Sequence, residues 1–408
     1  MAEILQQTLD NGLTVLLEPM PHLPSASFEL LIPMGSATDP RGLEGSAAVL
    51  RDWLFRGAGE HTSRQLSDAL DELGVRRGGH ASVEHTTFSA SLLADLLRPA
   101  LGLFADALQR PHLLDSEFEP AKALALQELA SLDDNPVQRV FVALSEQYFA
   151  SGHGRSPYGS HQALTAMTAE QVRQDYQQRV SPQGAILAVA GGITWDELLT
   201  AVEASLSSWQ GPPPAPLEVE LRPTRVHHLP AETAQVQIGV AYRGVAPGEP
   251  GYYEYALATA VLSSGMSSRL FSEVREKRGL VYAVAAVNRA VRGLGYTLGY
   301  AGTTAERADE TLQVLLYELR RLSRGVSGEE LARARTGILS HLVMQGESSG
   351  ARASALARDT FLFGQPRTLM ELRRLVEQVD LDTINAFLAT QADQAFTITT
   401  LGPRALSA

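Results

Sequence analysis

The stretch Gly42–Gly59, GLEGSAAVLRDWLFRGAG, predicts the helix around which the rest of the chain is arranged. Its apolar residues recur at helical spacing and predict one buried helix face: Ala47, Leu50 and Leu54. Ala48 and Asp52 stand four residues apart on a neighbouring face, one helical turn from each other. Two side chains in that arrangement can share a metal ion.

In the motif H-x-x-E-H, two histidines occupy these positions and bind zinc, and the glutamate between them is the general base. Here the five positions read Ala48-Val49-Leu50-Arg51-Asp52. Alanine offers no lone pair, and arginine puts a fixed positive charge where the base would stand. We therefore expect this chain to bind no zinc at this helix.

The surrounding residues carry a family resemblance. GSATDPRGLEGSAAVLRDWLFRGAG resembles the active-site segment of the pitrilysin-like (insulinase, processing-peptidase) zinc metallopeptidases, with the metal-binding and base positions changed. In that family a second helix supplies the third zinc ligand, a glutamate, and FEPAKALALQELASLDDNP matches that helix. The resemblance places Glu128 at the third-ligand position and Ala121 at the position of an auxiliary glutamate. Either Arg51, Asp52 and Glu128 are solvated helix charges, or Arg51 occupies the vacated site and pairs with Asp52 or Glu128.

Composition limits the function further. The chain has 408 residues, 44% of them apolar and 20% charged, which is typical of globular proteins with about two to four domains. A formal net charge of −12 argues against nucleic acid or an anionic membrane as the main partner. The sequence contains no cysteine, which excludes disulfides, thiolate metal sites and a cysteine nucleophile. No secretory signal or long apolar run is evident, so we expect a cytoplasmic protein.

The order of predicted elements indicates a duplicated α+β domain. Prolines in GPPPAPLEVELRP cannot continue a helix or a central strand, and they mark a linker at 210–224 between domains at 1–209 and 225–408. Beyond the linker the same succession of strands and helices returns, at an offset of about two hundred residues. The resemblance implies two homologous domains, each a mostly antiparallel sheet covered by helices, which together form half of a chamber.

The second domain keeps a motif that carries chemistry. MSSRLFSEVREKRGLVYAV resembles the C-terminal-domain motif of the same family, in which an arginine and a tyrosine hydrogen-bond the substrate next to the scissile bond. These residues are Arg275 and Tyr282 here. A helix ending at Gly279 and turning into a strand would let the two side chains converge. Guanidinium and phenol groups suit a peptide carbonyl that gains negative charge, but neither can generate a nucleophile.

Two other patterns are weaker. His80 and His85 are five residues apart, a spacing that sends the side chains to opposite faces of a strand. GESSG at 346–350 fits G-x-S-x-G, but it follows a helical run and lacks the strand that a nucleophile elbow requires.

The sequence thus predicts a zinc-free, beta-type subunit of a two-subunit bacterial peptidase. Its partner would be a paralogous chain with an intact H-x-x-E-H helix, which supplies the zinc, and the substrates would be unfolded peptides. This chain would hold no cofactor and would be inactive alone, where it could form homodimers. One alternative is a structural or assembly protein of the same family without a peptidase role. Another is an enzyme that is active without a partner, but the sequence contains no recognisable set of catalytic residues for it.

Overall fold

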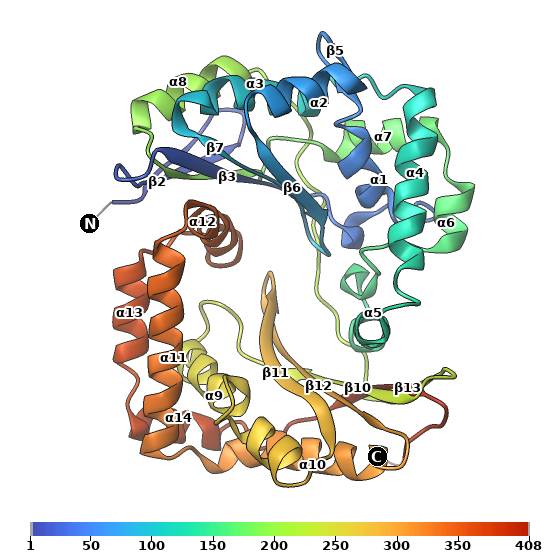
Figure 1. The fold of residues 1–408 in the computed structure, drawn as a ribbon, viewed down its shortest axis with the longest axis vertical. Coiled ribbons are helices and arrows are strands. Elements are labelled where there is room, and N and C mark those ends of the chain that lie inside the picture. The colour runs from blue at the N-terminus through green and yellow to red at the C-terminus, as the bar shows by residue number, and fades with distance from the viewer. Residues whose placement is uncertain (1–2, 407–408) are drawn as a thin grey trace. The chain divides into compact units, whose positions relative to one another are not determined.

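Two mixed β-sheets and a small two-stranded ribbon form the framework of the chain in the computed structural model, which describes residues 3–406 (Figure 1). The contacts between residues divide the chain into two compact units. The first comprises 1–131, 155–218 and 345–368, and the second comprises 132–154, 219–344 and 369–408.

The sheet of the first unit has six strands in the order β1-β2-β8-β3-β7-β6. Neighbouring strands run antiparallel except β2 and β8, which are parallel. Helices cover this sheet, and β4 and β5 form the ribbon. The strands are β1 (Leu5–Thr8), β2 (Thr14–Pro19), β3 (Ser25–Ile32), β4 (Gly57–Ala58), β5 (His61–Thr62), β6 (Arg76–Ala81), β7 (Thr86–Leu93) and β8 (Ile186–Gly191). The helices between them are α1 (Ser46–Trp53), α2 (Ser63–Glu72), α3 (Leu97–Gln109), α4 (Asp115–Ala130), α6 (His161–Ala166), α7 (Ala169–Arg179) and α8 (Trp195–Leu206).

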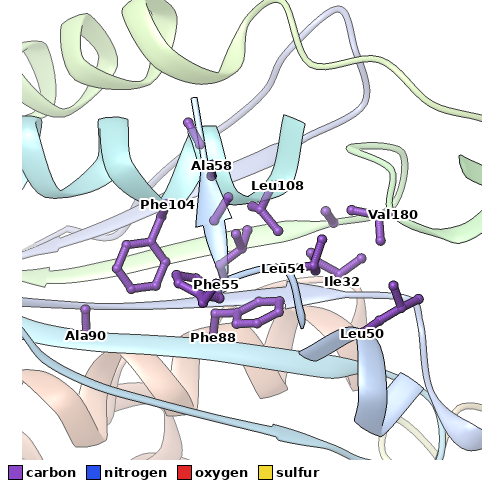
Figure 2. Packing of buried hydrophobic residues seen from close by; sticks show 14 of the residues in the cluster. Ile32, Leu50, Leu54, Phe55, Ala58, Phe88, Ala90, Phe104, Leu108 and Val180 are labelled. Atoms are coloured by element: carbon purple, nitrogen blue, oxygen red, sulfur yellow. The ribbon is translucent and has the colours of Figure 1, made fainter. Parts of the chain in front are cut away.

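The apolar face of α1 is buried as its sequence spacing predicts. Leu50 of α1 and Leu54, directly after α1, lie in one hydrophobic cluster with Ile32 of β3 and Val180, which follows α7 (Figure 2). All four side chains are buried, so transfer of their apolar surface out of water holds α1 against the sheet.

The sheet of the second unit repeats the first. Its order is β11-β12-β10-β13-β9, and only β13 and β9 are parallel. β9, β13, β10, β12 and β11 therefore correspond in order and direction to β2, β8, β3, β7 and β6. The strands are β9 (Val226–Pro230), β10 (Gln235–Arg243), β11 (Val281–Val291), β12 (Leu294–Thr304) and β13 (Thr397–Gly402). The helices are α5 (Pro136–Tyr148), α9 (Tyr252–Ser263), η4 (Phe271–Glu276), α10 (Ala308–Arg321), α11 (Gly328–Gly346), α13 (Leu369–Glu377) and α14 (Leu381–Ala389). The expected α+β fold with two related, mostly antiparallel sheets is confirmed.

Two helices each pack on the sheet formed by the other half of the sequence. Helix α5 comes from the first half of the sequence but packs on β10 and β13 of the second sheet. Helix α12 (Ser349–Phe363) comes from the second half but packs on β3 and β8 of the first sheet. Because β10 and β13 correspond to β3 and β8, the exchange is reciprocal.

A buried ion pair holds α12 on the first sheet. Arg352 of α12 is almost fully buried, and its guanidinium lies 2.6 Å from the carboxylate of Glu18 in β2. The Ser349 hydroxyl also lies 2.9 Å from that of Ser27 in β3. Burying a charge costs free energy unless the charge is paired, so these contacts favour one position of α12 on the sheet.

The domain boundaries expected at 1–209, 210–224 and 225–408 stay a prediction. Within 3–406, none of the helices is long and apolar enough to cross a membrane.

Candidate functional site

Buried charges fix the start of α1. Gly45 has φ +107° and turns the chain into the helix. The Asp39 carboxylate accepts hydrogen bonds from the Gly45 amide at 2.7 Å and the Ala47 amide at 3.2 Å. Burial raises the pKa of Asp39, and the Arg179 guanidinium, 3.0 Å away, opposes that rise. A carboxylate at this end of a helix satisfies amides that have no partner within the helix.

The ligand positions on α1 hold no metal-binding set. Ala48 is buried and has no donor atom. At the base position, the Arg51 guanidinium donates a hydrogen bond to the Glu128 carboxylate of α4 at 2.6 Å. This confirms the hypothesis that Arg51 pairs with one of the neighbouring carboxylates, and it identifies Glu128 as the partner.

Asp52 has a different partner. Its carboxylate pairs with Arg56, one turn further along the chain, and Arg56 also lies 3.4 Å from Glu117 of α4. The i, i+4 spacing of Asp52 and Arg56 is a signal for this pair that the sequence analysis did not use. Glu117 gave no comparable signal, because only the packing of α4 against α1 brings it close.

These residues do not fit a zinc ion. A zinc site of this kind takes three protein ligands, usually histidine or carboxylate. Both carboxylates that could contribute, Asp52 and Glu128, are engaged by guanidinium groups, and Ala121 is a buried alanine in the core. Within residues 3–406, no group of three histidine, cysteine, aspartate or glutamate side chains is placed to hold a metal ion.

The weaker sequence patterns have structural explanations. His80 Nδ1 lies 2.9 Å from the Thr87 hydroxyl on the neighbouring strand, and the ring of His85 packs edge-on against Phe361. In GESSG, the Ser348 hydroxyl caps α12 by accepting a hydrogen bond from the Ala351 amide at 3.3 Å. The segment is therefore a helix start.

In the second unit, Arg275 and Tyr282 lie on either side of a tight turn. Arg275 is in η4, a π-helical turn, and its guanidinium stacks over the Phe271 ring at 4.8 Å. Gly279 has φ +60°, and its amide donates to the Arg275 carbonyl at 3.0 Å. This is the glycine-terminated helix end that the sequence predicted. The π-helical geometry of this turn was not predicted from the sequence.

Tyr282 is at a bulge in the edge strand β11. Val281 pairs with Thr303 of β12 and Ala283 pairs with Gly302, so Tyr282 is the extra residue. Its side chain is 71% exposed, and Arg275 is exposed as well. No hydrogen bond joins these two side chains to each other or to other side chains in the described part of the chain. Both therefore have their donors free for an external acceptor.

Comparison with known proteins identifies the family. Residues 14–159 match the model described as "Insulinase (Peptidase family M16)", and residues 166–338 match "Peptidase M16 inactive domain". An uncharacterized zinc protease of Mycobacterium tuberculosis H37Rv is 28% identical over 412 residues, which cover 97% of this chain and 92% of the relative. An uncharacterized zinc protease of Bacillus subtilis is 25% identical, and the match covers 98% of both chains.

Solved structures share the fold. A protein described as a peptidase M16 inactive domain, from Pseudomonas fluorescens, superimposes with a TM-score of 0.88 at 21% identity, over 100% of this chain and 99% of the other. A protease from Helicobacter pylori gives a TM-score of 0.90 at 18% identity, over 98% and 100%. Two models of one family match most of the chain in succession, and the relatives match it nearly end to end. This chain thus belongs to the peptidase M16 (insulinase) family, with Ala48, Arg51 and Asp52 at the positions where the sequence resemblance places the H-x-x-E-H residues.

Proposed function

We propose that this chain is the zinc-free subunit of a heteromeric zinc peptidase and binds peptide substrates through Arg275 and Tyr282. Its partner is a paralogous chain with an intact H-x-x-E-H helix, which provides the metal, the attacking water and the general base. The relatives named zinc proteases support the peptidase assignment. The acidic, cysteine-free composition favours a cytoplasmic location.

The observation that carries the proposal is the contrast between the two motifs. At α1, the two carboxylates that could serve as metal ligands form ion pairs with guanidinium groups. At η4 and β11, two exposed donors remain where the family binds substrate. Irregular backbone supports a functional role for these two positions, because π-helical turns and β-bulges are over-represented at functional sites.

The chemistry of the pair suits a reacting peptide bond. When water attacks a peptide carbonyl, negative charge develops on its oxygen. The Tyr282 hydroxyl and the Arg275 guanidinium can both donate hydrogen bonds to that oxygen or to a neighbouring carbonyl. Neither group activates water, so we expect the isolated chain to bind peptides without cleaving them.

Cleavage by the assembled complex tests this role. Replacing Tyr282→Phe or Arg275→Ala should lower peptide turnover by roughly 10²-fold, because each change removes a donor to the developing charge. Zinc content and subunit association should stay unchanged. Tyr317→Phe, at a half-exposed tyrosine on α10, is the matched control and should cleave at the normal rate. If both variants of the pair cleave normally while the complex is intact, the chain has a structural or assembly role.

A further inference from the structure

One face of the second sheet is left open at its β11 edge. Helix α5 packs on β10 and β13 of this face (Figure 1). The Val291 end of β11 is also buried, in one cluster with Leu144 and Tyr148 of α5. Ala286 of β11 and Ala301 of β12 point to the opposite face, where they belong to the buried core. By strand alternation, the open part of this face consists of Ala283, Ala285, Val287 and Arg289 of β11. The neighbouring Tyr296 and Tyr300 of β12 contact aromatic rings of α5, so β12 is partly covered.

The open face is apolar where solvent-facing sheet surfaces are normally polar. Antiparallel sheets with one solvated face usually alternate apolar and polar residues. Here Val287 is 37% exposed and Ala283 is exposed, although both are apolar. Residues 281–304 contain no aspartate or glutamate, in a chain with a net charge of −12. An exposed apolar strip without acidic residues can accept an apolar segment.

An aromatic side chain of fixed position, Tyr300, lies close to Ala283. Gly302 lies opposite Ala283, and a Cβ atom there would come within 2.8 Å of the Tyr300 hydroxyl. The Tyr300 ring is held in place, because its hydroxyl donates to Gln237 Oε1 at 2.5 Å and its ring lies 5.7 Å from that of Phe141 in α5. The fixed Tyr300 ring therefore offers an aromatic contact beside the small residues of β11.

The charge on the open face indicates a second property of the ligand that could bind there. Arg289 is exposed on the open face, and its guanidinium makes no ion pair or hydrogen bond with the rest of residues 3–406. An unpaired arginine on an otherwise uncharged strip of an acidic protein complements a carboxylate. Tyr282 and Arg289 are seven strand positions apart, which is roughly 23 Å at ~3.3 Å per residue.

From these observations we infer that the open face is a subsite for an extended peptide segment with apolar side chains and a carboxylate. The apolar side chains lie over Ala283, Ala285 and Val287, and the carboxylate pairs with Arg289. The inference rests on the proposed function, since it takes Tyr282 as the point where the peptide backbone is held. It adds a substrate preference, apolar and acidic, that Arg275 and Tyr282 alone do not provide.

Peptide binding to the full, isolated chain tests the subsite without any cleavage. The probe is a fluorescein-labelled octapeptide that alternates leucine with threonine and carries one glutamate near its end; its anisotropy is followed as the protein is titrated. Val287→Asp should weaken binding roughly tenfold, because it puts a charge against the leucine side chains. Val343→Asp is the matched control on α11, where the side chain is 62% exposed, and should bind normally.

A charge swap gives the decisive comparison. Changing the glutamate of the probe to lysine should weaken binding to the unaltered chain roughly tenfold, and Arg289→Glu should restore it. Arg98→Glu, at another exposed arginine in the first unit, should not restore it. No saturable binding, or a lysine probe that Arg289→Glu fails to rescue, would overturn the subsite. Failure of the proposed function is separate, since it appears as normal cleavage by Tyr282→Phe in the assembled complex.

Discussion

The Arg51 guanidinium lies 2.6 Å from the Glu128 carboxylate, so an arginine pairs with the residue that the family resemblance places at the third-ligand position. Arg51 therefore has two effects at the site. It puts a cation where the resemblance places the general base, and it neutralises the Glu128 carboxylate.

The Arg51 and Glu128 side chains should be coupled in stability. They are 18% and 34% exposed, so the pair is partly screened by solvent. A double-mutant cycle of Arg51→Ala and Glu128→Ala, measured by urea unfolding, should give a coupling of about 0.5–1 kcal/mol. Arg64→Ala with Asp68→Ala, a highly exposed pair on α2, should give a smaller value. Equal coupling free energies in the two pairs would show that the Arg51–Glu128 pair stabilises the fold no more than an ordinary surface ion pair.

Restoring the family's ligands should restore metal binding, because α1 and α4 still pack against each other. We expect the triple variant Ala48→His, Arg51→Glu and Asp52→His to bind about one zinc ion per chain. Atomic absorption after dialysis against a low concentration of chelator measures this. Adding Glu128→Gln to the triple variant should sharply lower the zinc content. A triple variant that retains no zinc would mean that the framework, as well as the ligands, has diverged.

Helix α12 should depend on its buried ion pair. Glu18→Ala leaves the Arg352 guanidinium buried without a charged partner and should destabilise the chain by about 3 kcal/mol. Replacing both residues with leucine should cost less, because no buried charge remains. Urea unfolding followed by circular dichroism provides both values. If the single change is harmless, α12 is not held on the first sheet as the structure shows.

The pair of Arg269 and Glu330 should make stability depend on pH. The pKa of Glu330 is lowered from its ordinary 4.5 to about 2. The main cause is the hydrogen bond from Arg269, and the Ser327 amide makes a smaller contribution. The Glu330 carboxyl therefore binds its proton less readily in the folded state than in the unfolded state. The stability that the pair contributes is fully present above about pH 4.5 and is lost as the pH falls toward about 2. Glu330→Gln should cost about 2 kcal/mol at pH 7 and progressively less in that acidic range. An equal cost at pH 7 and near pH 2.5 would contradict this.

Local signals in the sequence predicted much of the fold. The apolar runs at 13–18 and 26–33 are typical of strands, and the structure has β2 and β3 there. Thr168 with Gln171 and Ser327 with Glu330 have the three-residue spacing of a capping box, and both boxes are formed. These features depend on residues within one turn or one strand of each other, so the sequence alone specifies them.

Features that depend on distant partners were not predicted. The exchange of α5 and α12 follows from the packing of each helix on a sheet far away in sequence, and neither helix was identified. The sequence of 80–92 predicts a single strand, but the structure has the end of β6, a turn and most of β7 there. The Ser82 amide donates a hydrogen bond to the His85 carbonyl and the chain reverses. The bulge at Tyr282 likewise depends on pairing with β12.

The zinc content and peptidase activity of the isolated chain test the central claim most directly. The purified chain should contain no stoichiometric zinc by atomic absorption, and should cleave a peptide mixture only after a partner with an intact H-x-x-E-H helix is added. Stoichiometric zinc in the isolated chain, together with peptide cleavage that a chelator abolishes, would contradict the division of roles between the two subunits.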